Sequence, residues 1–413
     1  MSIMKRAIKT YLIAIASMAM IGCGEDRSHE FYELTKENQW TYNTMKEAYL
    51  WADSIKSLNQ RDYFATPSRF FDNLLYKSDN ASFVSSAENT VGYGFSFSLM
   101  RDPLGIEPAR VYALVEYVDP SSVAASAGLE RGMWISAING RNINMGTGSA
   151  LKSGDAITMT ANLISYDDDA EAYVWNELPP IDMQAATATT ISPLPVTSVV
   201  SDNSGKIGYI LCNSFDADAT IEDIHNTLSA FDSEGVTAIV LDLRYFSGTS
   251  ITNAAAVASS FVPLDKQGAV FCTLYKDLKF ETKENVLFSQ TAINVADKPL
   301  YIITTAKTTG MASAFIKALR LVRGTSNLRI VGQTAKVTDI ATESIESPYD
   351  FTINPATSII ADANGEILTA TTPDYELSEY GDSKHIYPLG NKQEYLLYNI
   401  AYIIANGTLP ADL

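Results

Sequence analysis

The clearest pattern of apolar and polar positions runs from Pro299 to Val337. Leu300 to Thr304 is a short apolar run rich in β-branched residues, which is typical of a strand covered on both faces. Apolar residues then recur at helical spacing from Met311 to Val322, and Gly324 follows as a helix end. A second apolar run extends from Leu328 to Val331. This order predicts one βαβ unit with a tight turn before the helix.

A similar unit precedes it in the chain. Lys206 to Asn213 and Val236 to Leu243 are apolar runs of strand length, and the segment from Asp218 to Gly235 between them has helical spacing. Together the two units predict an α/β core with a parallel sheet over residues 201–413. In such sheets ligands lie at the carboxyl ends of the strands, where the start of the next helix offers free N–H groups to an anion.

The N-terminal part has a different pattern. Trp40 to Ile55 carries aromatic residues on one helical face, and Pro67 to Tyr76 is a second helix with proline near its start, so residues 39–90 are expected to form a small helical cap. Residues 23–38 are polar and are expected to be a tether. Residues 166–200 combine an acidic patch with an Ala, Thr and Pro-rich run, and are expected to be a linker or an extended strand entering the core.

Residues 91–165 resemble a PDZ domain. Gly92-Tyr93-Gly94-Phe95 matches the PDZ carboxylate loop, and Ala127-Gly128-Leu129 and Ile138-Asn139-Gly140 follow in the expected order. The resemblance implies that Tyr93, Gly94 and Phe95 receive the carboxylate of a polypeptide terminus while a strand edge pairs with its backbone. The same short motif could also serve only to close a tight hairpin.

The net negative charge of the chain argues against two classes of partner, nucleic acids and anionic lipids. The 413 residues carry a formal charge of -18, and residues 1–22 contain three basic residues and no acid, so the remainder of the chain has a charge of -21. An acidic surface of this kind repels the phosphates of nucleic acids and anionic lipids, so neither is expected as a partner.

The first 22 residues have the form of an export signal. A basic start is followed by an apolar run from Tyr11 to Ile21, which is too short to span a bilayer in the mature protein. Met20-Ile21-Gly22-Cys23 looks like a lipobox, which predicts a lipidated Cys23 at the mature N-terminus and a location at the outer membrane, either on its inner side or on the cell surface. The alternative is a secreted protein without an anchor.

The cysteines and histidines offer little chemistry of their own. Cys212 and Cys272 each lie in an apolar, strand-like run; export permits a disulfide between them, and two buried thiols are the alternative. The histidines are scattered and lack the spacing of metal ligands, so we expect no metal, no cofactor and no Ser-His-Asp triad. Their positions are His29, His225 and His385.

With these features, the chain resembles the C-terminal processing (tail-specific) serine peptidases, in a branch of lipoproteins from Bacteroidota. The family pattern is a strand, T-x-S-A-S-E at the start of a helix, and a strand that ends in G-x-x-T-x-G-K; the first serine is the nucleophile and the lysine is the general base. Asp242 to Gly248, DLRYFSG, is similar to the loop whose glycines help to form the oxyanion hole. The resemblance implies a tail-specific protease or crotonase-like α/β core, and an oxyanion region at Ser247, Gly248, Met311 and Ala312.

The catalytic positions depart from this pattern. Laid on the family motif, the nucleophile falls on Met311 and the lysine falls on Thr338. Ser313 and Lys336 are the candidate catalytic pair, but each stands two residues away from its expected place. Two helical residues displace a side chain by about 3 Å along the helix axis and about 200° around it. Productive catalysis tolerates about 1 Å, so either the turn has slipped or the nucleophile has been lost.

Two functions follow from the resemblance. The first is a peptide-binding lipoprotein whose PDZ-like domain holds polypeptide termini and whose catalytic site is degenerate. The second is an active serine peptidase with a Ser/Lys dyad made by Ser313 and Lys336, or by Thr309 in place of Ser313. The departures at Met311, Thr338 and Ser247 favour the first function.

Overall fold

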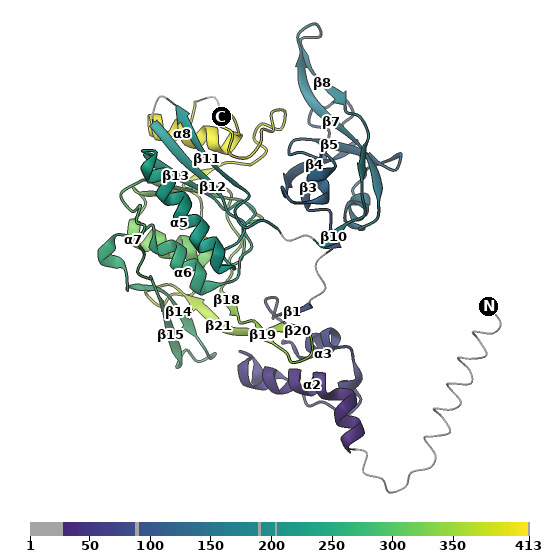
Figure 1. The fold of residues 1–413 in the computed structure, drawn as a ribbon, viewed down its shortest axis with the longest axis vertical. Coiled ribbons are helices and arrows are strands. Elements are labelled where there is room, and N and C mark those ends of the chain that lie inside the picture. Colours follow the sequence, from purple (N-terminus) through teal and green to yellow (C-terminus); the bar gives the residue numbers. More distant parts are fainter. Residues whose placement is uncertain (1–27, 87–90, 189–190, 203–204, 412–413) are drawn as a thin grey trace, which may run out of the picture.

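The computed structural model describes residues 28–86, 91–188, 191–202 and 205–411 (Figure 1). The expected export signal and Cys23 lie outside the described residues. The chain forms a large α/β core, a β domain at the upper right of Figure 1, and an N-terminal helical part at its lower end. In the described part of the chain, no helix is both long enough and apolar enough to cross a membrane.

A six-stranded sheet forms the centre of the core. Its strand order is β11-β12-β13-β16-β17-β22. All neighbours from β12 onward are parallel, and only β11 runs antiparallel to its neighbour. The predicted α/β core on a parallel sheet is therefore confirmed. The strands are β11 (Val196–Asp202), β12 (Gly205–Leu211), β13 (Ala238–Asp242), β16 (Leu300–Thr304), β17 (Leu328–Gly332) and β22 (Tyr375–Glu376).

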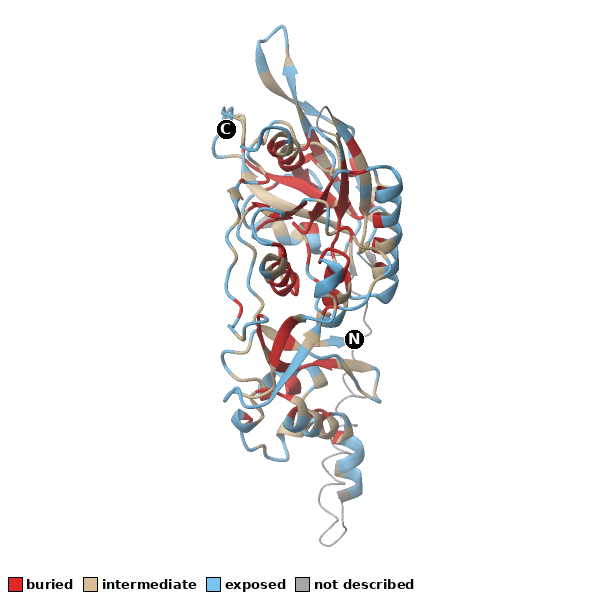
Figure 2. Ribbon diagram, turned by 90° about the vertical axis from the view of Figure 1, so that its left-hand side faces the viewer, coloured by how far each residue is buried: buried red, intermediate tan, exposed pale blue. Residues whose placement is uncertain are grey.

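Helices cover both faces of this sheet, because its strands are apolar on both sides. One face packs against α5 (Asp218–Ser233), α6 (Ile251–Ser259) and α7 (Ala312–Arg323). The other face packs against α8 (Tyr395–Asn406). Figure 2 shows the buried residues concentrated in the strands and on the inner sides of these helices.

A smaller antiparallel sheet extends the core toward the N-terminal helices. Its order is β15-β14-β21-β18, and β18 is an edge strand because it pairs only with β21. The strands are β14 (Val270–Tyr275), β15 (Lys283–Leu287), β18 (Ile340–Thr342) and β21 (Ala356–Ala361). Cys272 lies in β14 and Cys212 follows β12; both are buried free thiols, and burial raises the pKa of each, to about 12 for Cys272.

The N-terminal helices begin earlier than the sequence predicts. Helix α2 spans Ser28–Ala48, so residues 28–38, expected to be a tether, form its first half. Thr35 and Asn38 are buried there, and the Asn38 amide donates to the carbonyl oxygens of Tyr63 and Ala65. Some of the polar residues that suggested a tether therefore fix α2 to the segment that contains Tyr63 and Ala65. The other elements are η1 (Ala52–Ser54), η2 (Asp62–Phe64) and α3 (Pro67–Leu74).

A three-stranded sheet joins these helices to the core. Strand β1 (Phe83–Ser86) pairs with β20 (Phe351–Asn354), which in turn pairs with β19 (Ile345–Glu346). Segments more than 250 residues apart in the sequence therefore share one sheet, as the pairing of Phe83 with Asn354 shows. This pairing holds the helical part against the core beside β18 (Figure 1).

The β domain has its own core and its own sheet. Its main strand order is β3-β4-β5-β7-β8, so β3 is an edge strand. Residues 166–200 were expected to be a linker or an extended strand entering the core. Most of this range instead completes β7 and forms β8 and β9 of this sheet, whereas its end, the start of β11, is a strand that enters the core sheet. The strands are β3 (Phe95–Arg101), β4 (Val111–Val118), β5 (Trp134–Ile138), β6 (Arg141–Asn142), β7 (Ile157–Asp167), β8 (Ala172–Glu177) and β9 (Ile181–Met183).

Four short elements complete the described part of the β domain. Strand β2 (Val91–Gly92) pairs with β10 (Thr187–Ala188), which brings the two ends of the domain together. The helical turns are α4 (Val123–Ser126) and η3 (Thr147–Lys152). Gly148 of η3 lies against β3, because a Cβ atom at this position would be 3.2 Å from Leu99 Cδ1.

A buried network of charges holds the β domain and the C-terminal segment to the core. Arg244, just after β13, has no exposed side-chain surface and contacts three carboxylates: Asp242 at 2.7 Å, Glu394 at 2.8 Å and Glu379 at 3.2 Å. Arg131 of the β domain contacts Glu379 at 2.8 Å. Buried charges are tolerated only when each is paired, so the network fixes these segments relative to one another.

The carboxyl groups of this network respond differently to their surroundings. Burial alone would raise the pKa of Glu379, but the guanidinium groups of Arg131 and Arg244 outweigh burial and lower it to about 2. The pKa of Asp242 is raised, because burial outweighs the adjacent Arg244. Glu379 therefore stabilises the fold above its ordinary pKa of 4.5, and this contribution is lost as the pH falls toward 2.

We predict that Arg244→Met lowers the free energy of unfolding by about 3–5 kcal/mol, because it leaves buried carboxylates without a cation. Asp242 would keep two neutral donors, the Tyr209 hydroxyl at 2.7 Å and the backbone N–H of residue 244 at 3.0 Å, but no cation. Urea unfolding measures the change. Arg320→Met is the matched control, because Arg320 binds Asp374 near the surface at 2.7 Å and should cost about 1 kcal/mol or less. Equal losses in the two variants would contradict the prediction.

Candidate active site

The loop between β16 and α7 is positioned by hydrogen bonds to the loop that follows β13. Thr305 Oγ1 donates to the carbonyl oxygen of Arg244 at 2.6 Å, and Thr308 Oγ1 donates to that of Leu243 at 2.8 Å. Gly310 has φ +62°, and a Cβ atom there would be 2.1 Å from the carbonyl oxygen of Gly248. Only glycine fits this position, because the two loops touch backbone to backbone.

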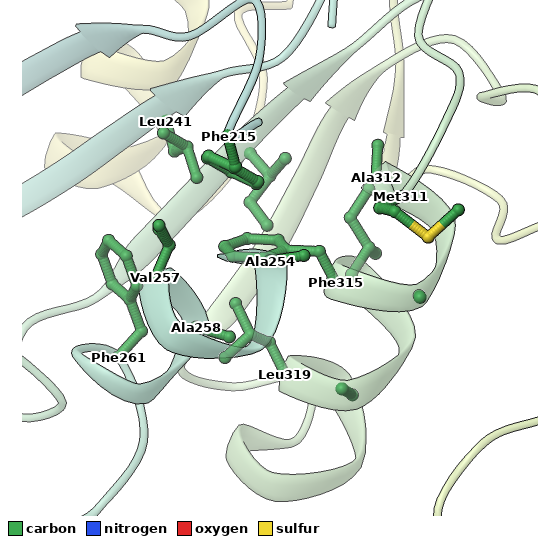
Figure 3. Packing of buried hydrophobic residues seen from close by; sticks show 14 of the residues in the cluster. Phe215, Leu241, Ala254, Val257, Ala258, Phe261, Met311, Ala312, Phe315 and Leu319 are labelled. Carbon is green, nitrogen blue, oxygen red and sulfur yellow. The ribbon is translucent and has the colours of Figure 1, made fainter. Parts of the chain in front are cut away.

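Met311 occupies the start of α7, where the resemblance places the nucleophile. It is the N-cap residue, it makes no side-chain capping hydrogen bond, and it is 2% exposed. Figure 3 shows Met311 and Ala312 at the first turn of α7, ahead of Phe315 and Leu319, which face α6. The side chain at this position thus extends the apolar core and offers no hydroxyl.

The backbone at this position is also engaged. The N–H of Met311 donates to the carbonyl oxygen of Gly248 at 2.8 Å, and the N–H of Thr309 donates to that of Phe246 at 2.9 Å. In an oxyanion hole such N–H groups point at the reacting oxygen and have no other acceptor. The Met311 N–H, named from the sequence as part of the oxyanion region, is already satisfied within the protein.

The other residues of the expected oxyanion region differ in exposure. Ser247 is exposed, its N–H donates to the carbonyl oxygen of Asn213 at 2.9 Å, and it is not among the residues with positive φ. Serine therefore replaces glycine here without backbone strain. Gly248 and Ala312 are both buried.

Ser313 has a structural partner. Its Oγ donates to the carbonyl oxygen of Thr338 at 3.2 Å and accepts from the N–H of Thr338 at the same distance. Ser313 is 7% exposed. The pair of bonds ties the first turn of α7 to Thr338, the position in the segment after β17 where the resemblance expects the lysine.

Lys336 is close to the same segment but faces solvent. Its backbone N–H donates to the carbonyl oxygen of Thr308 at 2.9 Å, while its side chain is exposed. Both Ser313 and Lys336 are described residues, and no hydrogen bond joins their side chains. The structure thus places Ser313 in the first turn of α7 and Lys336 in the adjacent segment after β17, without a hydrogen bond between their side chains.

A cleft of about 530 Å³ lies over this region. Its lining comes from the start of β1 and the residues before it, the loops after β13 and β16, the segment between β17 and β18, and the edge strand β18. Neutral polar and small side chains predominate, with Lys336 and Asp339 as the charged members. The lining residues are Asn80, Ala81, Phe83, Ser247, Thr249, Thr309, Gly310, Met311, Lys336, Val337, Thr338, Asp339, Ile340 and Thr342.

Comparison with known families gives two matches from one family. Residues 36–97 match the N-terminal domain of peptidase S41, and residues 206–377 match peptidase family S41 itself. The chain belongs to peptidase family S41. The first match covers most of the helical part and the start of the β domain, and the second covers the core from β12 to β22. Together they contain every residue that lines the cleft.

One solved structure with a similar fold agrees with this assignment. A candidate S41 protease from Bacteroides fragilis is 25% identical to this S41 chain, with a TM-score of 0.75, and the match covers 89% of this chain and 97% of that one. A photosystem II D1 C-terminal processing protease is 13% identical, with a TM-score of 0.49, over 83% of this chain and 93% of that one. The search of curated proteins gave no match.

One contact beside the S41 site was not identified from the sequence. Lys307, in the loop before α7, forms an ion pair with Glu116 of β4, which also contacts Ser98 of β3 and Tyr380. The Glu116 side chain has no exposed surface. The sequence does contain a sign of this ion pair, because Glu116 interrupts the apolar run VYALVEYV. A charged side chain in a buried strand needs a partner of opposite charge.

We predict that Ser313→Ala destabilises the fold by about 1 kcal/mol, because the Thr338 N–H loses its acceptor. Urea unfolding measures this effect. Ser233→Ala is the control, since Ser233 Oγ only donates to the carbonyl oxygen of Ser229 on an exposed part of α5, and it should change stability by less than about 0.5 kcal/mol. A Ser313→Ala variant as stable as the wild type would show that these two bonds contribute nothing.

Proposed function

We propose that this protein is an exported, lipid-anchored S41 homologue that binds polypeptides and does not hydrolyse them. One observation carries the proposal: Met311 stands at the head of α7 with a buried thioether side chain and with its N–H bonded to Gly248. The position therefore lacks a nucleophile, and the adjacent oxyanion donor is occupied.

The loss of the nucleophile reduces the rate of hydrolysis so strongly that binding is the better supported function. Removing the nucleophile of a serine peptidase lowers kcat by several orders of magnitude, and only weak catalysis from the remaining groups survives. The expected general base is also absent, because Thr338 stands at its position. Neither Ser313, which is bonded to the Thr338 backbone, nor the exposed Lys336 supplies a dyad.

The cleft over the site still suits an extended polypeptide. It is lined by backbone-rich loops and by Ile340 and Thr342 of the edge strand β18. An edge strand has unpaired N–H and C=O groups, which is the feature that lets a second chain pair with a sheet. Loss of the attacking hydroxyl removes catalysis without removing this surface.

The β domain adds a second polypeptide site in this proposal. The carbonyl oxygens of Tyr93 and Gly94 accept hydrogen bonds from Ala124 and Asp119 at 3.0 and 2.8 Å. Within the described chain, no acceptor is found for the N–H groups of Tyr93 and Gly94. A terminal carboxylate is the ligand that such successive N–H groups bind, and the edge strand β3, which begins at Phe95, would pair with the rest of the peptide.

The anchor and location belong to the same proposal. The sequence supports them through the apolar run before Gly22 and the lipobox-like Met20 to Cys23. A lipid on Cys23 would hold the protein at the outer membrane. The charge of -21 on the remaining chain keeps the protein from binding anionic lipid through its own surface.

We predict that the purified protein does not cleave an unfolded polypeptide such as β-casein, because no described hydroxyl at the head of α7 is paired with an amine. Appearance of new peptide termini over time, followed by mass spectrometry, measures cleavage. Hydrolysis that Ser313→Ala and Lys336→Met each abolish would establish the competing function, an active Ser/Lys peptidase. Cleavage that survives Ser313→Ala and disappears in both Lys336→Met and Thr309→Val would establish Thr309 as the nucleophile.

We predict that the β domain binds peptides through their carboxyl ends. A pool of fluorescently labelled peptides with free carboxyl ends should bind at least about tenfold more tightly than the same pool amidated at the C-terminus, since hydrogen bonds to a charged acceptor are lost. Fluorescence anisotropy measures both affinities.

A blocking variant tests the location of this binding. Gly148→Leu places a side chain against Leu99 and Phe97 of β3, where the glycine Cβ position is 3.2 and 3.7 Å from their nearest atoms. Ser149→Leu, at the exposed neighbour in the same turn, is the control. Equal binding of the free and amidated pools, or equal affinity in the two variants, would refute capture at this loop.

A further inference from the structure

A separate cleft of about 400 Å³ is formed by α8 and the loop before it, and it shares no lining residue with the candidate active site. Tyr395, Tyr398 and Asn399 stand at positions i, i+3 and i+4 of α8 and therefore lie on one face of the helix. Asp382 and Tyr387 of the preceding loop complete most of the lining. The cleft thus combines three tyrosines with one carboxylate.

The carboxylate is held in place but remains accessible. Asp382 Oδ2 lies 2.7 Å from His385 Nδ1, and His385 Nε2 lies 3.2 Å from the Tyr173 hydroxyl of β8. The Asp382 side chain is 41% exposed. The contacts of the imidazole on both nitrogens fix its orientation, so Asp382 presents a positioned negative charge to the cleft.

Asn399 provides an acceptor without a donor. Its side chain is 1% exposed, and its Nδ2 donates to the carbonyl oxygen of Tyr395 at 2.8 Å. Its Oδ1 is buried and has no hydrogen-bond partner. A buried polar atom of this kind costs free energy unless something bonds to it, and Asn399 is one of the residues that line the cleft. The missing partner must donate a hydrogen bond.

We propose that this cleft binds a primary alkylammonium group, either as a free amine or as a lysine side chain. Such a group has three N–H donors and no acceptor, which matches Asn399 Oδ1 and the Asp382 carboxylate. Its positive charge is also attracted to the electron-rich faces of tyrosine rings. The same part of the surface already holds one ammonium in this way, since Lys384 Nζ lies 4.7 Å from the centre of the Tyr173 ring.

A neutral sugar fits the lining less well. A sugar hydroxyl is both donor and acceptor, and a sugar therefore needs donors from the protein as well. The cleft offers the Gln393 amide and tyrosine hydroxyls, whereas its carboxylate and its unpaired amide oxygen are both acceptors. The excess of acceptors favours a ligand that only donates.

The test is calorimetric titration of the full chain with 1,5-diaminopentane, which should bind saturably. Asp382→Asn should weaken binding at least about tenfold by removing the charge, and Asn399→Leu should weaken it about three- to tenfold by removing the acceptor. Asp168→Asn removes a carboxylate of the same charge from an exposed position outside the cleft and should leave the affinity within about twofold. A lysine-containing peptide that binds more tightly than the free diamine identifies polypeptide as the source.

Two further ligands, tetramethylammonium and glucose, distinguish recognition of an ammonium group from recognition of charge alone or of hydroxyl groups. Tetramethylammonium carries the charge without N–H groups and should bind at least about tenfold more weakly than the diamine. Equal affinity for the two cations, binding of the diamine that neither cleft variant changes, or binding of glucose in place of the diamine would each overturn the proposal. Circular dichroism of the variants confirms that α8 is intact, so loss of binding cannot be ascribed to unfolding.

Discussion

The buried pairing of Arg244 with Asp242, Glu379 and Glu394 is the constraint on which the arrangement of this protein depends. Ions removed from water are tolerated only in good geometry, so the end of β13, the β domain through Arg131 and the C-terminal segment must meet in one way. The carbonyl oxygen of Arg244 also accepts from Thr305. The network therefore positions the loop that leads to Met311, and the framework of the site is rigid whether or not chemistry occurs there.

This separation of framework from chemistry explains how the S41 fold persists with methionine at the head of α7. The hydrogen bonds that shape the site run between backbone atoms, as from Met311 N–H to Gly248, or use threonine hydroxyls. None requires a nucleophile. A methionine adds buried apolar area to the cluster that includes Phe315 (Figure 3). The fold at this site therefore does not depend on a hydroxyl at the head of α7.

The cleft over the candidate active site and the cleft beside α8 have different structural origins. The first lies at the carboxyl end of β16 and beside the edge strand β18, where the topology of a parallel sheet leaves a crevice. The second results from the spacing of Tyr395, Tyr398 and Asn399 along a single helix and from the loop that covers it. The position of the first cleft follows from the topology of the sheet, whereas the second cleft depends on which side chains α8 and the preceding loop carry.

Periodicity by itself determined the α/β core, because strands covered on both faces are continuously apolar and helices repeat every three to four residues. It located β16, α7 and β17 within one or two residues and placed the candidate site between them. Local composition failed where partners are distant. Residues 28–38 looked like a tether although Asn38 bonds to Tyr63, and the expected linker contains β8 and β9, which pair with β7. Only the tertiary structure decided that Ser313 bonds to Thr338, that the Met311 N–H is occupied, and that Arg244 meets Glu394, since these contacts join segments whose proximity no local pattern encodes.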